Sequence, residues 1–141
     1  MPLSTALTAS ASALDAQRAR IEVAVSNIAN AESTRGPDGK PYRRRDVVLE
    51  SEPIAPFDGE LGRAEAIGVR VTDIVEDQGD FRRRYEPSHP DADAEGFVAM
   101  PNVDVPEEMV DMLGATRAYQ ANLTAINLIR DTIQRALELG R

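Results

Sequence analysis

The placement of proline is the feature of this 141-residue sequence that most limits its fold. Eight of the nine prolines lie between Pro37 and Pro106, and the remaining one is Pro2. An interior proline removes a backbone donor and clashes with the preceding helical turn, so long helices can form only in the two flanking segments. The sequence therefore predicts an α+β fold, with one long helix at each end and a small β domain between them.

The N-terminal segment carries a heptad pattern. Its large apolar residues recur every seven positions, at Leu7, Leu14, Ile21 and Ile28. The residues three positions before each of them are Ser4, Ala11, Arg18 and Val25. This spacing is typical of the d and a positions of a coiled-coil helix and predicts a helix over residues 4–30. Because large residues are sparse on this seam, we expect the helix to need neighbours for its stability.

The C-terminal segment repeats the pattern. Its d positions are Met112, Tyr119, Ile126 and Ile133, and its a positions are Met109, Thr116, Leu123, Arg130 and Leu137. Glu107 and Glu108 fall in the expected first turn and Arg135 in the expected last turn, an arrangement that complements the helix dipole. We therefore expect the two terminal helices to pair antiparallel as a coiled-coil-like stem.

The middle of the chain predicts short strands and turns. β-forming residues favour strands at 42–49, 67–75, 81–85 and 95–100. The composition of 36–39, 53–62 and 87–95 is typical of turns or loops. A turn at residues 77–80 separates the second and third expected strands, which we therefore expect to form a hairpin. The whole predicts a small sheet of three to five strands.

Charge supports a division into three parts. The formal net charge is −8, and residues 37–101 hold nine basic and fifteen acidic groups with five of the six aromatic residues. We expect an N-terminal helix and turn over 1–36, a central acidic β-rich domain over 37–101 and a C-terminal helix over 102–141. Such acidity argues against a general binder of nucleic acid or of anionic membranes. Residues 1–14 resemble neither a transmembrane helix nor a cleaved signal peptide.

Few residues are available for catalysis. The sequence has no cysteine and a single histidine, His89, close to Asp91 and Asp93. We favour a solvated loop over a metal site there, with weak calcium binding as the alternative, because no second histidine is present and the rest of a calcium loop is missing. Phosphate-binding glycine loops and nucleophile elbows are also missing. We expect no catalytic residue, no cofactor and no metal.

Two arginine triplets occupy residues 43–45 and 82–84. Triplets of this kind can bind nucleic acid, but the surrounding segment is net acidic. Arginine's planar fork also suits carboxylate partners. We therefore expect these side chains to pair with carboxylates across strands or between subunits.

Two longer motifs resemble a known family. SNIANAEST at residues 26–34 resembles the Asn-rich signature of bacterial flagellar rod and hook proteins. GFVAMPNVDVPEEMVDM at residues 96–112, with RAYQAN at 117–122, is similar to the flagellar basal-body rod proteins, in particular to those of the proximal rod. PYRR at residues 41–44 is similar to the central segment of the same family.

The resemblance implies a structural subunit rather than an enzyme. Its terminal helices would polymerise into the hollow drive shaft that transmits torque and lets exported subunits pass, with the central region as an outer domain. The implied partners are other copies of the chain, other proximal-rod proteins, the basal-body base and the flagellar type III export apparatus, without nucleic acid or direct membrane insertion. The implied location is the rod that crosses the periplasm, reached without a cleaved signal peptide.

Seam residues and motif residues are together the candidates for the subunit interface. They are Leu7, Leu14, Ile21, Asn27, Ile28, Asn30, Met109, Met112, Arg117, Tyr119, Gln120, Asn122, Leu123, Ile126 and Ile133. For the motif residues, the alternative is capping and packing within one subunit. For the whole chain, the alternatives are a soluble coiled-coil adaptor that forms a small closed oligomer and, without any motif behind it, an acidic hydrolase.

Overall fold

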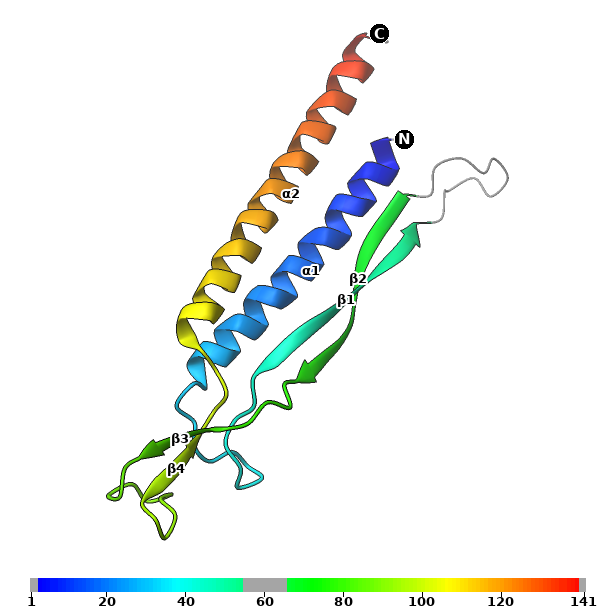
Figure 1. Cartoon of the computed structure of the whole chain (residues 1–141). Coiled ribbons are helices and arrows are strands. Elements are labelled where there is room, and N and C mark those ends of the chain that lie inside the picture. The colour runs from blue at the N-terminus through cyan, green and yellow to red at the C-terminus, as the bar shows by residue number, and fades with distance from the viewer. Residues whose placement is uncertain (1–2, 55–65, 140–141) are drawn as a thin grey trace. The chain divides into compact units, whose positions relative to one another are not determined.

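The computed structural model describes residues 3–54 and 66–139 (Figure 1). The elements follow in the order α1 (Leu3–Ala29), β1 (Arg45–Ile54), β2 (Ala66–Glu76), β3 (Arg82–Tyr85), β4 (Phe97–Met100) and α2 (Val105–Leu139). This order confirms the α+β fold with a long helix at each end. None of the described helices is long and apolar enough to cross a membrane.

The chain divides into two compact units, each built from separate pieces of sequence. The first unit comprises the described parts of 1–19, 48–73 and 114–141, and the second comprises 20–47 and 74–113. In each unit a part of α1 lies beside a part of α2, with the two helices running in opposite directions (Figure 1). The antiparallel pairing of the terminal helices is therefore confirmed.

The start of α2 follows from its first residues. Asp104 precedes the helix, and its Oδ1 accepts a hydrogen bond from the Glu107 N–H at 3.3 Å, as an N-terminal cap does. Glu107 and Glu108 lie in the first turn, as predicted. The prediction for Arg135 was wrong, because α2 continues to Leu139 and has no basic residue in its last turn. The residues after Arg135 are alanine, leucine and glutamate, which are strong helix formers.

Strand pairing differs from the prediction. β1 pairs with β2, and β3 pairs antiparallel with β4, so the described residues form two separate two-stranded sheets. The predicted hairpin between residues 67–75 and 81–85 was wrong. Tyr85 lies opposite Phe97, and their rings meet edge to face at 5.2 Å between centroids. This aromatic contact stabilises β3 against β4 rather than against β2.

The turn predictions hold at residues 36–39 and 87–95, whereas residues 77–80, where a turn was also predicted, form an irregular connection without an assigned turn. Residues 36–39 and 87–95 contain turns, and Gly39 and Gly96 have positive φ angles of 72° and 84°. Of the loop predicted at 53–62, Pro53 and Ile54 belong to β1, and the remainder lies outside the described residues.

The buried face of α1 differs from the predicted heptad seam. Leu7, Leu14, Ile21 and Ile28 are only half-buried. The buried residues of α1 are instead Thr5, Ala16, Ala24 and Asn27. α1 therefore buries small or polar side chains within one subunit and leaves its large aliphatic ones partly exposed.

Small residues bring α1 close to β2 in the first unit. The Val69 N–H donates a hydrogen bond to Ser12 Oγ at 3.1 Å. A Cβ atom added to Gly68 would lie 2.9 Å from Ser12 Oγ and 3.2 Å from Ile54 Cδ1. The close approach thus requires both the glycine on the strand and a small residue on the helix.

Candidate assembly site

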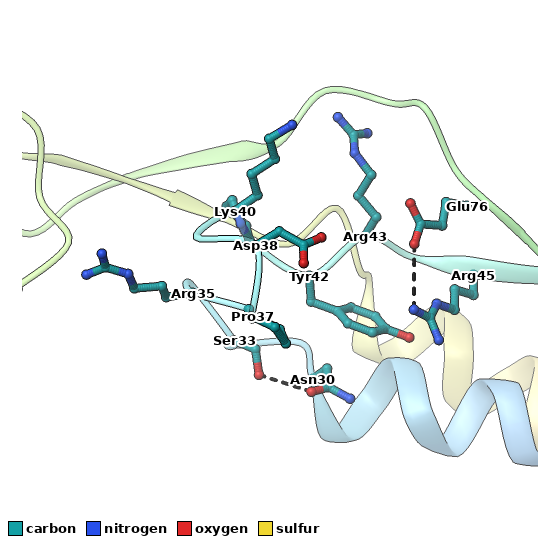
Figure 2. Close-up of a pocket in the computed structure, with 12 residues that line it drawn as sticks. Asn30, Ser33, Arg35, Pro37, Asp38, Lys40, Tyr42, Arg43, Arg45 and Glu76 are labelled. Carbon is teal, nitrogen blue, oxygen red and sulfur yellow. Dashed lines mark hydrogen bonds and ion pairs between the residues drawn. The ribbon is translucent and has the colours of Figure 1, made fainter.

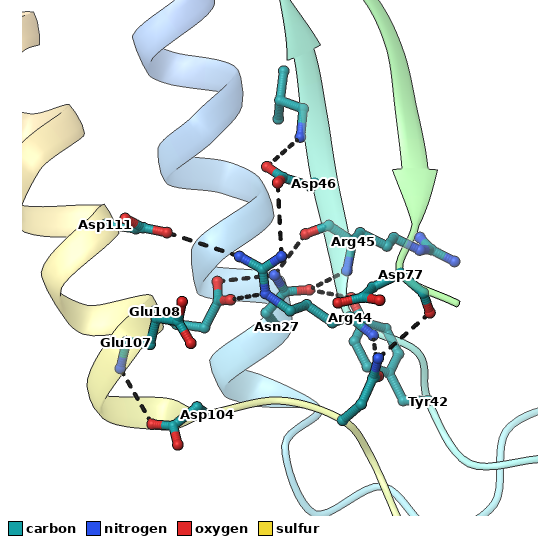
Figure 3. A network of polar contacts seen from close by, with 12 residues as sticks. Asn27, Tyr42, Arg44, Arg45, Asp46, Asp77, Asp104, Glu107, Glu108 and Asp111 are labelled. Atoms are coloured by element: carbon teal, nitrogen blue, oxygen red, sulfur yellow. Dashed lines mark hydrogen bonds and ion pairs between the residues drawn. The ribbon is translucent and has the colours of Figure 1, made fainter. Parts of the chain in front are cut away.

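Asn27 is the centre of a polar cluster in the second unit and has no exposed surface. Its Oδ1 accepts hydrogen bonds from the Tyr42 hydroxyl at 2.9 Å and from the Arg45 N–H at 3.0 Å. Its Nδ2 donates to the Arg45 carbonyl at 2.8 Å and to Glu108 Oε2 at 2.9 Å. The full donor and acceptor capacity of the amide is therefore used, and α1 is joined to β1 and α2 (Figure 3).

Glu108 is the second buried member of this cluster, with 2% of its surface exposed. Its Oε1 accepts a hydrogen bond from Arg44 Nε at 2.6 Å. Arg44 also lies 3.6 Å from Asp46 and 3.8 Å from Asp111 (Figure 3). Burial on its own lowers the pKa of Arg44, but the hydrogen bond and charge of Glu108, with further nearby carboxylates, raise it overall. The buried carboxylate is thus fully paired.

The segment before α2 completes the cluster. Asn102 Oδ1 accepts from the Arg44 N–H at 2.9 Å, and its Nδ2 donates to the Asp77 carbonyl at 3.4 Å. The Asp77 N–H donates to the Arg44 carbonyl at 2.8 Å. Among the described residues no buried side-chain nitrogen or oxygen lacks a hydrogen-bond partner. The three motifs that carry the resemblance therefore meet at one place in the fold.

Asn30 and Thr34 close the end of α1. Asn30 Nδ2 donates to the Ser26 carbonyl at 2.9 Å, and its Oδ1 accepts from Ser33 Oγ at 3.2 Å. Thr34 Oγ1 donates to Asp91 Oδ2 at 2.9 Å. A carbonyl near the helix end is therefore bound by a side chain from the Asn-rich motif, as the sequence predicted. For Asn27 and Asn30 these contacts support the alternative of packing and capping within one subunit.

The arginine triplets mostly pair with carboxylates of the same chain. In the second triplet the pairs are Arg82 with Asp104 at 3.0 Å, Arg83 with Asp93 at 2.9 Å and Arg84 with Glu86 at 2.9 Å. In the first, Arg44 binds Glu108 and Arg45 lies 3.6 Å from Glu76. Arg43 differs, because it donates to the carbonyls of Asp77 and Gly79 and lies 4.4 Å from the centroid of the Phe81 ring.

The acidic loop around His89 is organised by its own carboxylates. Asp93 Oδ1 accepts from the N–H groups of Phe97 at 2.8 Å and Glu95 at 3.0 Å. The pKa of Asp93 is lowered, first by the Phe97 hydrogen bond and then by Arg83 and the Glu95 N–H. His89 Nδ1 accepts from the Asp91 N–H at 3.1 Å. In the part of the chain that the structure describes, no three potential metal ligands gather.

The remaining interface candidates divide by exposure. Those half-buried in one subunit are Leu7, Leu14, Ile21, Ile28, Asn30, Met112, Tyr119, Asn122, Ile126 and Ile133. Those exposed are Met109, Arg117, Gln120 and Leu123. Asn122 Nδ2 donates to the Ala118 carbonyl at 2.9 Å, a contact within the helix. These positions are spread along the two helices and the end of α1, and their role in assembly stays a prediction.

Exposed apolar side chains on α2 extend beyond the predicted seam. We call them the α2 apolar surface, and they are Met109, Val110, Leu113, Leu123, Leu128, Leu137 and Leu139. Leu128 is 63% exposed and Val110 67% exposed. The heptad pattern missed Leu128, because it falls outside the a and d positions. Seven large apolar side chains left exposed along one helix make α2 a candidate interaction surface.

Two family models match the ends of the chain. The model described as "Flagella basal body rod protein" matches residues 7–37, and the one described as "Flagellar basal body rod FlgEFG protein C-terminal" matches residues 94–139. These matches define the class: structural proteins of the flagellar rod, and not enzymes. They cover both terminal helices and the residues of the polar cluster on α1 and α2.

Relatives along nearly the whole chain are more specific. "Flagellar basal-body rod protein FlgC" of Escherichia coli O157:H7 is 47% identical over 130 residues, which is 92% of each chain. The protein of that name from Bacillus subtilis (strain 168) is 45% identical over 145 residues, 96% of each chain. The one from Borreliella burgdorferi is 38% identical over 153 residues, covering 99% of this chain and 98% of the relative. The chain therefore belongs to the family of flagellar basal-body rod protein FlgC.

Proposed function

We propose that this rod subunit polymerises through its terminal helices in the proximal rod, a hollow shaft that transmits torque and lets exported subunits pass. Membership of the family places the chain among the components of the flagellar basal body. Its neighbours there would be further copies of itself, other proximal-rod proteins and the basal-body base. It would reach the periplasm through the flagellar type III export apparatus without a cleaved signal peptide.

The observation that carries this proposal is the α2 apolar surface. Its members are between 44% and 90% exposed in a single subunit. Burying one such side chain contributes about 1.5–3 kcal/mol. Among the residues that the structure describes, the buried apolar core is composed of only six, three of them alanines. Contacts between subunits would therefore supply stabilisation that the single subunit lacks.

The polar cluster supports the same proposal by fixing the geometry of the surface. In the second unit Glu108 ties the first turns of α2 to α1 and β1 through Asn27 and Arg44. Met109, Val110 and Leu113 follow directly on that turn and are exposed. The cluster thus holds these side chains at a defined position against the end of α1. A shaft that transmits torque needs such rigid presentation.

The substitution Leu128→Asp tests the proposal. Leu128 is 63% exposed, so the single subunit should fold unchanged, whereas a carboxylate buried between subunits would cost several kcal/mol. We expect loss of swimming motility and of the chain from isolated basal bodies. The matched control is Asn127→Asp, which adds the same charge at the adjacent exposed position.

Circular dichroism of the purified variants separates misfolding from failed assembly. Normal motility and normal rods with Leu128→Asp would contradict assembly through this surface. A sharp size limit of the purified chain in light scattering at high concentration would instead favour the closed coiled-coil oligomer.

A further inference from the structure

A cavity in the second unit lies where the chain passes from α1 to β1. Its volume is about 430 Å³, and its lining comes from residues 30–45 together with Glu76 (Figure 2). The charged side chains of the lining are Arg35, Lys40, Arg43, Arg45, Asp38 and Glu76. The cavity thus carries two more positive than negative charges, in a chain whose formal net charge is −8.

Two of these cations have no carboxylate partner among the described residues. Arg45 lies 3.6 Å from Glu76, and Arg35 lies 3.4 Å from Asp91. Arg43 donates only to the backbone carbonyl groups of Asp77 and Gly79, and a backbone carbonyl group carries no net charge. The ammonium of Lys40 is exposed and makes no hydrogen bond or ion pair with the described residues.

Lys40 and Arg43 also lie close enough in the fold to act together. Both line the cavity, and Figure 2 shows both side chains extending toward the same side of it. Arg43 is held in place by the ring of Phe81 and by two carbonyl groups, so its guanidinium is already oriented. An oriented guanidinium and an exposed ammonium that line one cavity are a suitable receptor for carboxylate groups.

We propose that this cavity binds a carboxylate-bearing segment of a neighbouring subunit. The inference rests on the proposed function, because it requires the chain to be packed beside other subunits. Charge complementarity identifies the occupant. The chain as a whole is negatively charged and repels acidic partners, whereas the lining of this cavity carries a net positive charge. Exposed carboxylates that make no contact with the described residues, such as Glu50 and Asp80, show that each copy also has acidic groups to offer.

The proposed contact would fix how neighbouring subunits are aligned against each other, in addition to contributing affinity. An acidic segment is attracted only where the positive charge is concentrated and is repelled along the rest of the acidic surface. The cavity and the free carboxylates occupy different places on the same chain. If the contact is made in one direction only, so that each cavity holds a carboxylate of the next copy, it is heterologous, which is the type that propagates around a ring or along a helix.

Lys40 makes a direct test possible, because it is the only lysine in the sequence. A carbodiimide activates a carboxylate and couples it to an amine in contact with it, so any cross-link that uses a lysine of this chain must use Lys40. Basal bodies would be isolated from a strain that carries this chain as its only copy, treated with carbodiimide and analysed by mass spectrometry. We expect an intermolecular cross-link from Lys40 to an aspartate or glutamate, absent from Lys40→Gln.

Basal bodies that contain the chain but yield no intermolecular cross-link from Lys40 would overturn the inference and leave the proposed function intact. A cross-link only to Asp38 of the same chain would overturn it equally. If the chain is missing from the basal bodies altogether, the proposed function itself has failed.

Charge reversal gives the second readout. Lys40→Glu breaks no contact within the described chain, so the subunit should fold normally. We expect it to lower the amount of chain in basal bodies at least about threefold, with rescue by Lys40→Arg. Arg70→Glu is the charge-matched control, since Arg70 is exposed, lies on β2 and is outside the cavity. It loses only an exposed ion pair with Glu52 at 3.6 Å, a kind of contact that contributes little to stability. Equal effects of both reversals would contradict a specific site.

Discussion

At the scale of single residues, Asn27 has the most demanding environment in the described structure. Its amide is enclosed and meets one hydroxyl, two backbone groups and one carboxylate. A buried amide can be replaced by a side chain of the same shape only if every donor and acceptor finds an equivalent partner. Among natural side chains of this shape, only asparagine offers both an N–H₂ donor and a carbonyl acceptor.

We therefore expect Asn27→Asp to be strongly destabilising. The new carboxylate oxygen would lie where Nδ2 now is, 2.9 Å from Glu108 Oε2, so two buried negative groups would face each other. The free energy of unfolding should fall by about 3–5 kcal/mol, measured by urea denaturation. Asn30→Asp, the same change at a half-buried position that faces a carbonyl, should cost only about 1 kcal/mol.

Glu108→Gln in the Asn27→Asp background is the internal check on this explanation. The glutamine can donate the hydrogen bond that the aspartate now needs, so the double variant should regain much of the lost free energy. Simple addition of the two single losses would show that the carboxylates do not interact.

At the scale of elements, the helices and strands are held by close approach rather than by large side chains. α1 buries alanine, threonine and asparagine, and β2 approaches it at Gly68. Such contacts tolerate no added volume. Because small and polar residues occupy the buried face of α1, its aliphatic heptad residues stay half-exposed and are available for contacts between subunits.

Two glycines give a matched pair of predictions at this scale. Gly68→Ala would place a methyl group 2.9 Å from Ser12 Oγ and should lower the free energy of unfolding by about 1–3 kcal/mol. Gly114→Ala adds a methyl group in open space within α2 and should raise it by up to about 1 kcal/mol through helix propensity. Thermal denaturation of both variants measures the difference, and destabilisation by both would contradict this account of the contacts.

At the scale of the whole molecule, stability is unevenly distributed. The second unit contains the polar cluster, the β3–β4 pair and most of the buried residues, including Val98, Met100 and Val103. In the first unit the last residues of α2 are highly exposed, with Leu137 at 68% and Leu139 at 90%. A single subunit should therefore lose its helix ends before it loses its cluster.

Limited digestion with an arginine-specific protease tests this order. In dilute solution we expect rapid cleavage at the arginines in the outer parts of the two helices, which are Arg18, Arg20, Arg130 and Arg135. A slower-cleaved product should retain Asn27 and Glu108. The protected part would then extend beyond residues 37–101, the central domain expected from the sequence. Mass spectrometry identifies the fragments. If both helix ends resist cleavage fully, a single subunit needs no neighbours to order them.

Much of the fold could be predicted from local sequence. Proline restricts φ and cannot donate, so its confinement to the middle of the chain limited the two long helices to the terminal segments. Glu107 and Glu108 marked the start of α2 because dipole effects act within one turn, and the structure added the cap at Asp104. The family resemblance also depended on short, contiguous motifs.

Tertiary structure alone decided the contacts between distant residues. Strand propensity does not specify a partner, so the pairing of β1 with β2 and of β3 with β4 depended on which side chains meet across the strands. The heptad pattern identified apolar positions on α1 but not the face that one subunit buries. The contact of Asn27 with Glu108 spans 81 residues of sequence, and only folding brings those two side chains together.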